Sequence, residues 1–133
     1  MDIKTLSPSV LAFVGDAAYG LLVREHLANV NRKSGDLHSL SVKFVSATAQ
    51  VKAFNLIESD LSESEMAIFK RGRNFHTSSS PKGATVGDYH IATGLECLFG
   101  YLHLSGNKTR AEELFNKIWQ TFSADFADNK LQR

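Results

Sequence analysis

The sequence predicts an all-α domain of five to seven helices. Apolar residues recur at spacings of three and four along most of the chain, which is the pattern of amphipathic helices. No segment shows the strict apolar–polar alternation of a half-buried strand. With 133 residues, 43% of them apolar, the chain suits one domain that buries its own core. We expect a single domain over 1–133, with a core over about 8–122 and a frayed polar tail over 124–133.

Capping residues and breaks predict the first helices. Ser7-Pro8 combines an N-cap with proline at the first helical position, which predicts a helix over about 8–28 that is buried on most sides. Asp36 is expected to cap the next element, and apolar positions between 37 and 56 suit one long helix or two with a bend. Ser62 with Glu65 forms a capping-box pattern, which opens a helix ending in the basic run 70–73.

The second half of the chain predicts an irregular segment and two further helices. Residues 74–87 are rich in serine and glycine and contain a proline, and loops of this length in compact domains are more often functional than idle. A helix is expected over about 88–104. Ser105-Gly106-Asn107 ends it and caps the last helix, which carries apolar residues from 111 to 122.

Composition says more about the cellular compartment of the protein than about its function. One cysteine, Cys97, allows no internal disulfide and fits a reducing compartment. No apolar run approaches the ~18 residues of a membrane span, and the first residues lack the order of a secretory signal. We therefore expect a cytoplasmic protein with no membrane partner. The net charge of +1 neither supports nor excludes a nucleic-acid partner.

Two carboxylates stand alone in apolar helices. Asp16 is the only charged residue between Val10 and Val23, and Glu96 is the only Asp, Glu, Lys or Arg between Tyr89 and Leu104. Both segments contain glycine and alanine, so two such helices can pack closely and bring the acids together. Burying a carboxylate is costly without compensation. The pair can share a proton, pair with a distant base, or bind a divalent cation; a capping role or an arginine partner for each acid is the ordinary alternative.

Several segments resemble the ribonuclease III family, and in particular its short Mini-III branch. Residues 13–17, Phe-Val-Gly-Asp-Ala, are similar to the start of the family signature, and residues 94–102, Gly-Leu-Glu-Cys-Leu-Phe-Gly-Tyr-Leu, resemble its later helix with a metal-binding glutamate. The segments 36–38, 45–47, 70–74, 80–82 and 89–93 look like Mini-III. The likeness runs in order and spacing over roughly residues 9–104.

The resemblance implies a helical homodimer whose central valley accepts double-stranded RNA. It also implies Mg²⁺-dependent endonucleolytic hydrolysis, with Mn²⁺ able to substitute, that leaves 5′-phosphate and 3′-hydroxyl ends. Mini-III enzymes mature the ends of large-subunit (23S) ribosomal RNA, and a ribosomal protein that presents the substrate is left open as a partner. On this resemblance Asp16 and Glu96 are the catalytic metal ligands.

The chain departs from the longer enzymes of the family at two acids. Ala12 stands where they have a glutamate and Thr93 where they have an aspartate, which leaves the other metal ligands open. Mini-III shares this thinner acid set. A separate RNA-binding domain is not expected either, so the catalytic dimer must hold the substrate unaided.

A basic cluster is the predicted RNA contact. Lys70, Arg71 and Arg73 lie at a helix end, where cations also favour the helix dipole. Three cations in four residues exceed what the dipole requires, so we predict phosphate contacts, with Asn74 and Lys82 as further donors. Such contacts read backbone and A-form shape more than base sequence.

Two other functions remain open from the sequence. The missing acids allow a non-catalytic RNA-binding or ribosome-assembly module of the same fold. A helical nucleotide pyrophosphohydrolase would cluster acids as ExxE, and the nearest match, Asp60 to Glu63, falls at a helix break. His38 has no assigned role, and no HExxH or phosphate-loop motif is present.

Overall fold

The prediction of an all-α domain is confirmed. The computed structural model describes residues 2–30, 32–75, 85–124 and 126, and this part of the chain holds six α-helices, two 3₁₀ turns and no strand. The elements, in order, are η1 (Ile3–Thr5), α1 (Pro8–Ala28), α2 (Ser34–Val45), α3 (Ala47–Ile57), η2 (Glu58–Asp60), α4 (Glu63–Arg73), α5 (Val86–Leu104) and α6 (Lys108–Phe122).

Most of the predicted helix starts are present. Ser7 accepts a hydrogen bond from the Val10 backbone N–H (3.3 Å), with Pro8 at the first helical position. The capping box of α4 is complete, with Ser62 and Glu65 bonding reciprocally to each other's backbone N–H. α5 begins two residues before the predicted start because the Thr85 hydroxyl caps it.

The segment from 34 to 57 forms two helices, which resolves the alternative left open by the sequence. Ser46 ends α2 and caps α3, accepting a hydrogen bond from the Ala49 N–H (3.2 Å). The prediction that Asp36 caps α2 was wrong: the helix starts at Ser34, its N-cap is Lys33 without a side-chain bond, and Asp36 lies in the first turn. An acid there still favours the positive end of the helix dipole.

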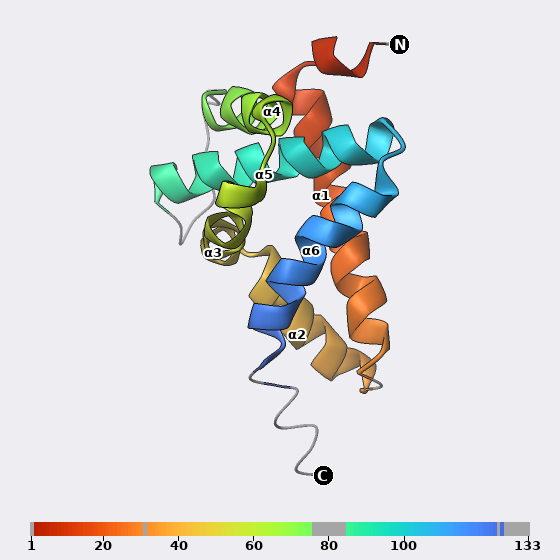
Figure 1. Cartoon of the computed structure of the whole chain (residues 1–133). Helices are drawn as coiled ribbons and strands as arrows, with labels where there is room; N and C mark the ends of the chain where they lie inside the picture. The colour runs from red at the N-terminus through yellow and green to blue at the C-terminus, as the bar shows by residue number, and fades with distance from the viewer. Residues whose placement is uncertain (1, 31, 76–84, 125, 127–133) are drawn as a thin grey trace.

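α5 is the central element of the domain. It crosses the middle of the molecule and contacts α1, α3, α4 and α6 (Figure 1). Its side chains are therefore buried on several sides, including Leu95, Leu98 and Leu102. A helix packed on every side reads as almost wholly apolar, and Glu96 stands out against that background.

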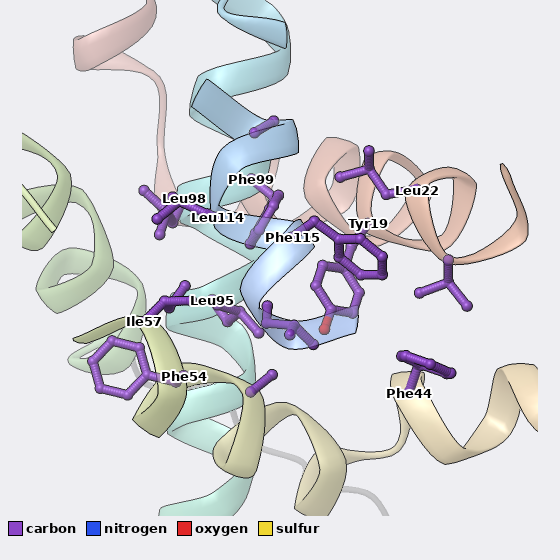
Figure 2. Packing of buried hydrophobic residues seen from close by; sticks show 14 of the residues in the cluster. Tyr19, Leu22, Phe44, Phe54, Ile57, Leu95, Leu98, Phe99, Leu114 and Phe115 are labelled. Carbon is purple, nitrogen blue, oxygen red and sulfur yellow. The ribbon is translucent and has the colours of Figure 1, made fainter. Parts of the chain in front are cut away.

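Aromatic side chains build the core between α1, α5 and α6. Tyr19 meets the rings of Phe99 and Phe115 edge-on, at centroid distances of 5.0 and 5.5 Å (Figure 2). Phe44 from α2 stacks on Trp119 beside them. The predicted frayed tail was wrong at Phe126, which is buried against Phe44 and Trp119. Residues 127–133 lie outside the described part of the chain.

The α1–α5 crossing is close enough for backbone contact. A Cβ atom at Gly15 would lie 1.6 Å from the carbonyl oxygen of Glu96, and one at Gly100 would lie 2.0 Å from the carbonyl oxygen of Leu11. Only glycine tolerates such an approach. The contact at Gly15 places the neighbouring Asp16 beside the turn of α5 that carries Glu96.

One face of α1 is exposed, contrary to the expectation that this helix is buried on most sides. Phe13 is 81% exposed, and Val10 and Leu21 are also exposed. These apolar side chains have no described neighbour that covers them, which is unusual for a large aromatic ring on a free surface. None of the described helices is long and apolar enough to cross a membrane.

Candidate active site

Asp16 and Glu96 line the same pocket, as the spacing of small residues predicted. The pocket has a volume of about 320 Å³ and lies between α1, the end of α4 and α5. Its lining residues are Ser9, Ala12, Phe13, Asp16, Phe75, Tyr89, Thr93 and Glu96. Asp16 is exposed and Glu96 half-buried, so the two acids sit at the mouth and on the wall of an open cavity.

The environment of Glu96 disfavours its charged form. Burial, the negative charge of Asp16 and a hydrogen bond with Asp16 together raise the pKa of Glu96 to about 7. A hydrogen bond from Gln50 opposes the shift. Among the described residues, neither acid forms a salt bridge with Lys, Arg or His. Within the described ranges, the two acids therefore have no cationic side chain to neutralise them.

This donor set fits a hydrated divalent cation. No cluster of three or more His, Cys, Asp or Glu side chains occurs in the described ranges, so the pocket offers two carboxylates and no closed cage. Mg²⁺ is commonly held by one or two carboxylates and keeps several of its waters. Two carboxylates in an open pocket with room for water match this coordination of Mg²⁺, whereas a structural zinc site would need four protein ligands.

The two positions that depart from the longer enzymes also line the pocket. Ala12 offers no ligand atom. The hydroxyl of Thr93 donates to the carbonyl of Tyr89 within α5 (3.0 Å) and is thereby bound back to its own helix. Neither position compensates for the absent carboxylates, so Asp16 and Glu96 carry the negative charge of this pocket alone.

Lys70 and Arg73 of the basic cluster are the members whose charged groups bind no backbone carbonyl in the described part of the chain, unlike Arg71. Lys70 is exposed, and Arg73 lies over the Phe69 ring (5.9 Å) while its Nε donates to Asn74 Oδ1 (3.2 Å). Phe75, which follows Asn74 directly, reaches the acidic pocket. Phe75 thus brings the chain that follows α4 to the acidic pocket, whereas Lys70 lines a different hollow beside Glu63 and Met66. Lys82 lies outside the described residues.

Arg71 has an internal task that the sequence did not reveal. Its guanidinium donates to the backbone carbonyls of Lys4 and Leu6, each at 2.7 Å, and so ties the N-terminal segment to α4. The acceptors are main-chain atoms far away in the chain, and no side-chain pattern announces them. Asp60, one acid of the alternative pair, is neutralised by a salt bridge with Lys117.

Gln50 is the other residue that the sequence analysis missed. It is only 3% exposed, its Nε2 donates to the carbonyl of Val45 (3.1 Å), and its side chain opposes the rise in the pKa of Glu96. A signal was present: with Ala53, Phe54 and Ile57, Gln50 shares the buried face of α3. A lone polar residue at an apolar face position usually has a polar partner.

Comparison with known proteins agrees with this geometry. Residues 9–107 match the family described as the Ribonuclease III domain. Similar curated proteins include the Mini-ribonuclease 3 of Clostridium tetani (38% identity, covering 88% of this chain and 79% of that protein) and of Thermoanaerobacter sp. (43%, 84% and 80%). The Mini-ribonuclease 3 of Enterococcus faecalis is 42% identical over 86% of this chain and 89% of its own length. A crystal structure of a Fusobacterium nucleatum protein superposes with a TM-score of 0.81 at 29% identity, over 90% of this chain and 97% of that one.

Proposed function

This chain belongs to the ribonuclease III family and is an endoribonuclease of the Mini-ribonuclease 3 type, and from that premise we propose that it cuts double-stranded RNA with a Mg²⁺ ion held by Asp16 and Glu96. The observation that carries the proposal is the convergence, in one open pocket, of two carboxylates that have no cationic partner in the part of the chain that the structure describes. Mn²⁺, which accepts the same oxygen ligands, is expected to substitute.

The protein's own residues bind and orient in this mechanism. A bound Mg²⁺ supplies a more acidic water and neutralises developing charge on a phosphodiester. Asp16 and Glu96 would hold the cation, since both line the acidic pocket. Phe75 and Tyr89 wall the pocket and limit how a phosphate can enter it. Products with 5′-phosphate and 3′-hydroxyl ends are expected.

We assign RNA binding to the basic end of α4. Lys70 and Arg73 present their charges at the end of α4, Asn74 adds a donor, and Lys82 extends the set along the chain. Arg71 contributes its charge from further inside, because two of its N–H groups are occupied by Lys4 and Leu6. These contacts suit the phosphate backbone of an A-form duplex.

The exposed face of α1 supports a homodimer. Phe13 lies on this face beside the acidic pocket, and its ring is too large and too exposed for an isolated surface. A twofold axis through this face would bury Phe13 against the partner and set two acidic pockets on one side of the dimer. Each pocket would then cut one strand of the duplex.

The substrate is proposed from the Mini-III resemblance. This resemblance supports a role in maturing the ends of the 23S ribosomal RNA precursor in the cytoplasm. A ribosomal protein is a candidate partner that would present that RNA. Incubating precursor RNA with and without ribosomal proteins would test both parts, because end maturation that needs no protein would remove the second.

The decisive experiment compares metal dependence with two isosteric variants. Wild type is expected to cut a duplex RNA only when Mg²⁺ is added, and Asp16→Asn and Glu96→Gln are each expected to lose the activity while keeping the fold. Glu25→Gln is the matched control, because Glu25 is an exposed acid on α1 outside the acidic pocket. Cleavage that persists in a chelator, or that survives both variants, would contradict the proposal.

A further inference from the structure

Tyr89 brings a hydroxyl group to the acidic pocket from the helix that also carries Glu96. It lies one turn into α5, and Tyr89, Thr93 and Glu96 follow one another at steps of four and three residues, which places them on one face of that helix. All three line the pocket that Asp16 lines from α1. Tyr89 therefore stands beside the place where the two acids would hold a metal ion.

Few side chains of this pocket can donate a hydrogen bond to a phosphate. Among the described lining residues, Asp16 and Glu96 are acids, and the alanine and the two phenylalanines have no donor. The Thr93 hydroxyl donates its only proton to the carbonyl of Tyr89 (3.0 Å). Within the part of the chain that the structure describes, the remaining hydroxyl donors of the pocket are those of Ser9 and Tyr89.

The tyrosine hydroxyl is the one that needs an external partner. A serine hydroxyl in a helix can bond back to a carbonyl of its own backbone, whereas a tyrosine hydroxyl lies at the far end of a rigid ring. The Tyr89 hydroxyl forms no hydrogen bond with any described residue. It is also open to solvent, unlike the buried hydroxyl of Tyr19. It is therefore available to donate to a molecule that enters the pocket.

The position of Tyr89 along α5 decides which part of the RNA its hydroxyl meets. Tyr89 precedes Glu96 by seven residues, which is about 10 Å along the helix axis at a rise of 1.5 Å per residue. Helical side chains also lean towards the N-terminus of their helix, so the ring of Tyr89 leans away from Glu96. The hydroxyl therefore faces the sugar–phosphate units beside the one that would lie at Asp16 and Glu96.

We propose that the Tyr89 hydroxyl is an RNA contact, donating a hydrogen bond to a phosphate oxygen that neighbours the scissile phosphate. The inference rests on the proposed function, because it takes Asp16 and Glu96 as the place of cleavage. The contact suits this pocket, whose described lining residues include no Lys, Arg or His to bind a phosphate. Hydroxyl groups that bind phosphate oxygens fix the register of a protein on a duplex without reading its base sequence.

The test uses Tyr89→Phe, which removes the hydroxyl and keeps the ring. In cleavage of duplex RNA with Mg²⁺, KM is expected to rise about tenfold, as for the loss of one hydrogen bond to a charged group. The value of kcat is expected to stay unchanged, because the contact is made equally in the bound substrate and in the transition state. Thermal unfolding should match that of wild type, because the hydroxyl has no described partner to lose.

Tyr101→Phe is the matched control. Tyr101 is a half-buried tyrosine of the same helix that does not line the acidic pocket, so its variant is expected to keep the KM and kcat of wild type. Lys70→Met gives a second comparison, because the loss of a cation is expected to raise KM and to flatten its dependence on salt. Tyr89→Phe removes no charge and should keep the salt slope of wild type.

Each outcome decides the matter. If wild type cuts duplex RNA and Tyr89→Phe has the KM of wild type, the contact is overturned and the proposed function survives. If Tyr89→Phe lowers kcat or Tm without raising KM, or if Tyr101→Phe raises KM equally, the contact is also overturned. If wild type does not cut duplex RNA, the proposed function fails and this inference falls with it.

Discussion

The contact between Gly15 and the backbone of α5 leads to a quantitative prediction for Gly15→Ala. A Cβ atom there would lie 1.6 Å from the carbonyl oxygen of Glu96, 2.5 Å from its carbonyl carbon and 2.9 Å from the backbone nitrogen of Gly100. All three atoms belong to the backbone of a helix, so no side chain can rotate away. The α1 and α5 axes must separate locally before the methyl group fits.

The magnitude follows from two opposing effects. Overpacking a tight interior costs about 1–3 kcal/mol, and a backbone clash belongs at the upper end of that range. Replacing glycine by alanine within a helix returns about 1 kcal/mol. We expect Gly15→Ala to lower the free energy of unfolding by about 2 kcal/mol, equivalent to a Tm decrease of about 8 °C for a domain of this size.

Activity is expected to fall further than stability. The separation of α1 from α5 moves Asp16 relative to Glu96, and a displacement of about 1 Å in a catalytic constellation can cost on the order of 100-fold in rate. The assay is thermal unfolding by circular dichroism together with duplex-RNA cleavage at a temperature where the variant is folded.

Gly20→Ala is the matched control. Gly20 lies on the same helix, and a Cβ there would meet nothing within 4 Å. It is expected to raise stability by up to about 1 kcal/mol and to leave cleavage unchanged. If Gly15→Ala proved as stable and as active as Gly20→Ala, the close α1–α5 crossing and the site built on it would be refuted.

Three further predictions follow from single contacts. Arg71→Met is expected to destabilise the fold by about 2 kcal/mol and to speed proteolysis near the N-terminus, because it removes two charged hydrogen bonds. Lys70→Met should do neither. Equal effects of the two variants would show that the bonds from Arg71 to Lys4 and Leu6 do not hold the N-terminal segment. The hydrogen bond and charge of Arg110 hold the pKa of Glu65 below its usual value, so this pair contributes stability above the pKa that Glu65 has in the unfolded chain and loses it as pH falls through the lowered pKa of the folded state. Urea midpoints measured from pH 7 to pH 3 should therefore fall more steeply for wild type than for Arg110→Met, and parallel curves would contradict the linkage. Phe13→Ser is expected to shift the protein from dimer to monomer in sedimentation, and an unchanged dimer would place the interface elsewhere.

Local sequence was sufficient for most helix boundaries. Ser7-Pro8 and the Ser62–Glu65 capping box act within one turn of the residues they cap, so their partners are close in the chain. The same reasoning failed at Asp36, because the helix gains a turn from Ser34 that no capping side chain marks. It also failed at Phe126, whose burial depends on rings from α2 and α6.

The acidic pair was accessible from sequence for a different reason. Burying a carboxylate that stands alone in an apolar, glycine-containing helix costs free energy, so its presence requires an explanation. Two such carboxylates suggested a common site that uses both. Their convergence in one pocket is what the structure adds. Their roles as metal ligands remain a prediction, to be tested by the variants above.

The amino-acid sequence by itself determined most of the helices, several of their caps and the two isolated acids, because each of these depends on neighbours a few residues away. Tertiary structure alone decided that Arg71 binds the carbonyls of Lys4 and Leu6 and that Gln50 binds the carbonyl of Val45. The physical reason is that these partners are backbone oxygens on other elements, and only the packing of α1, α3 and α4 around α5 sets which oxygen lies within reach of which donor.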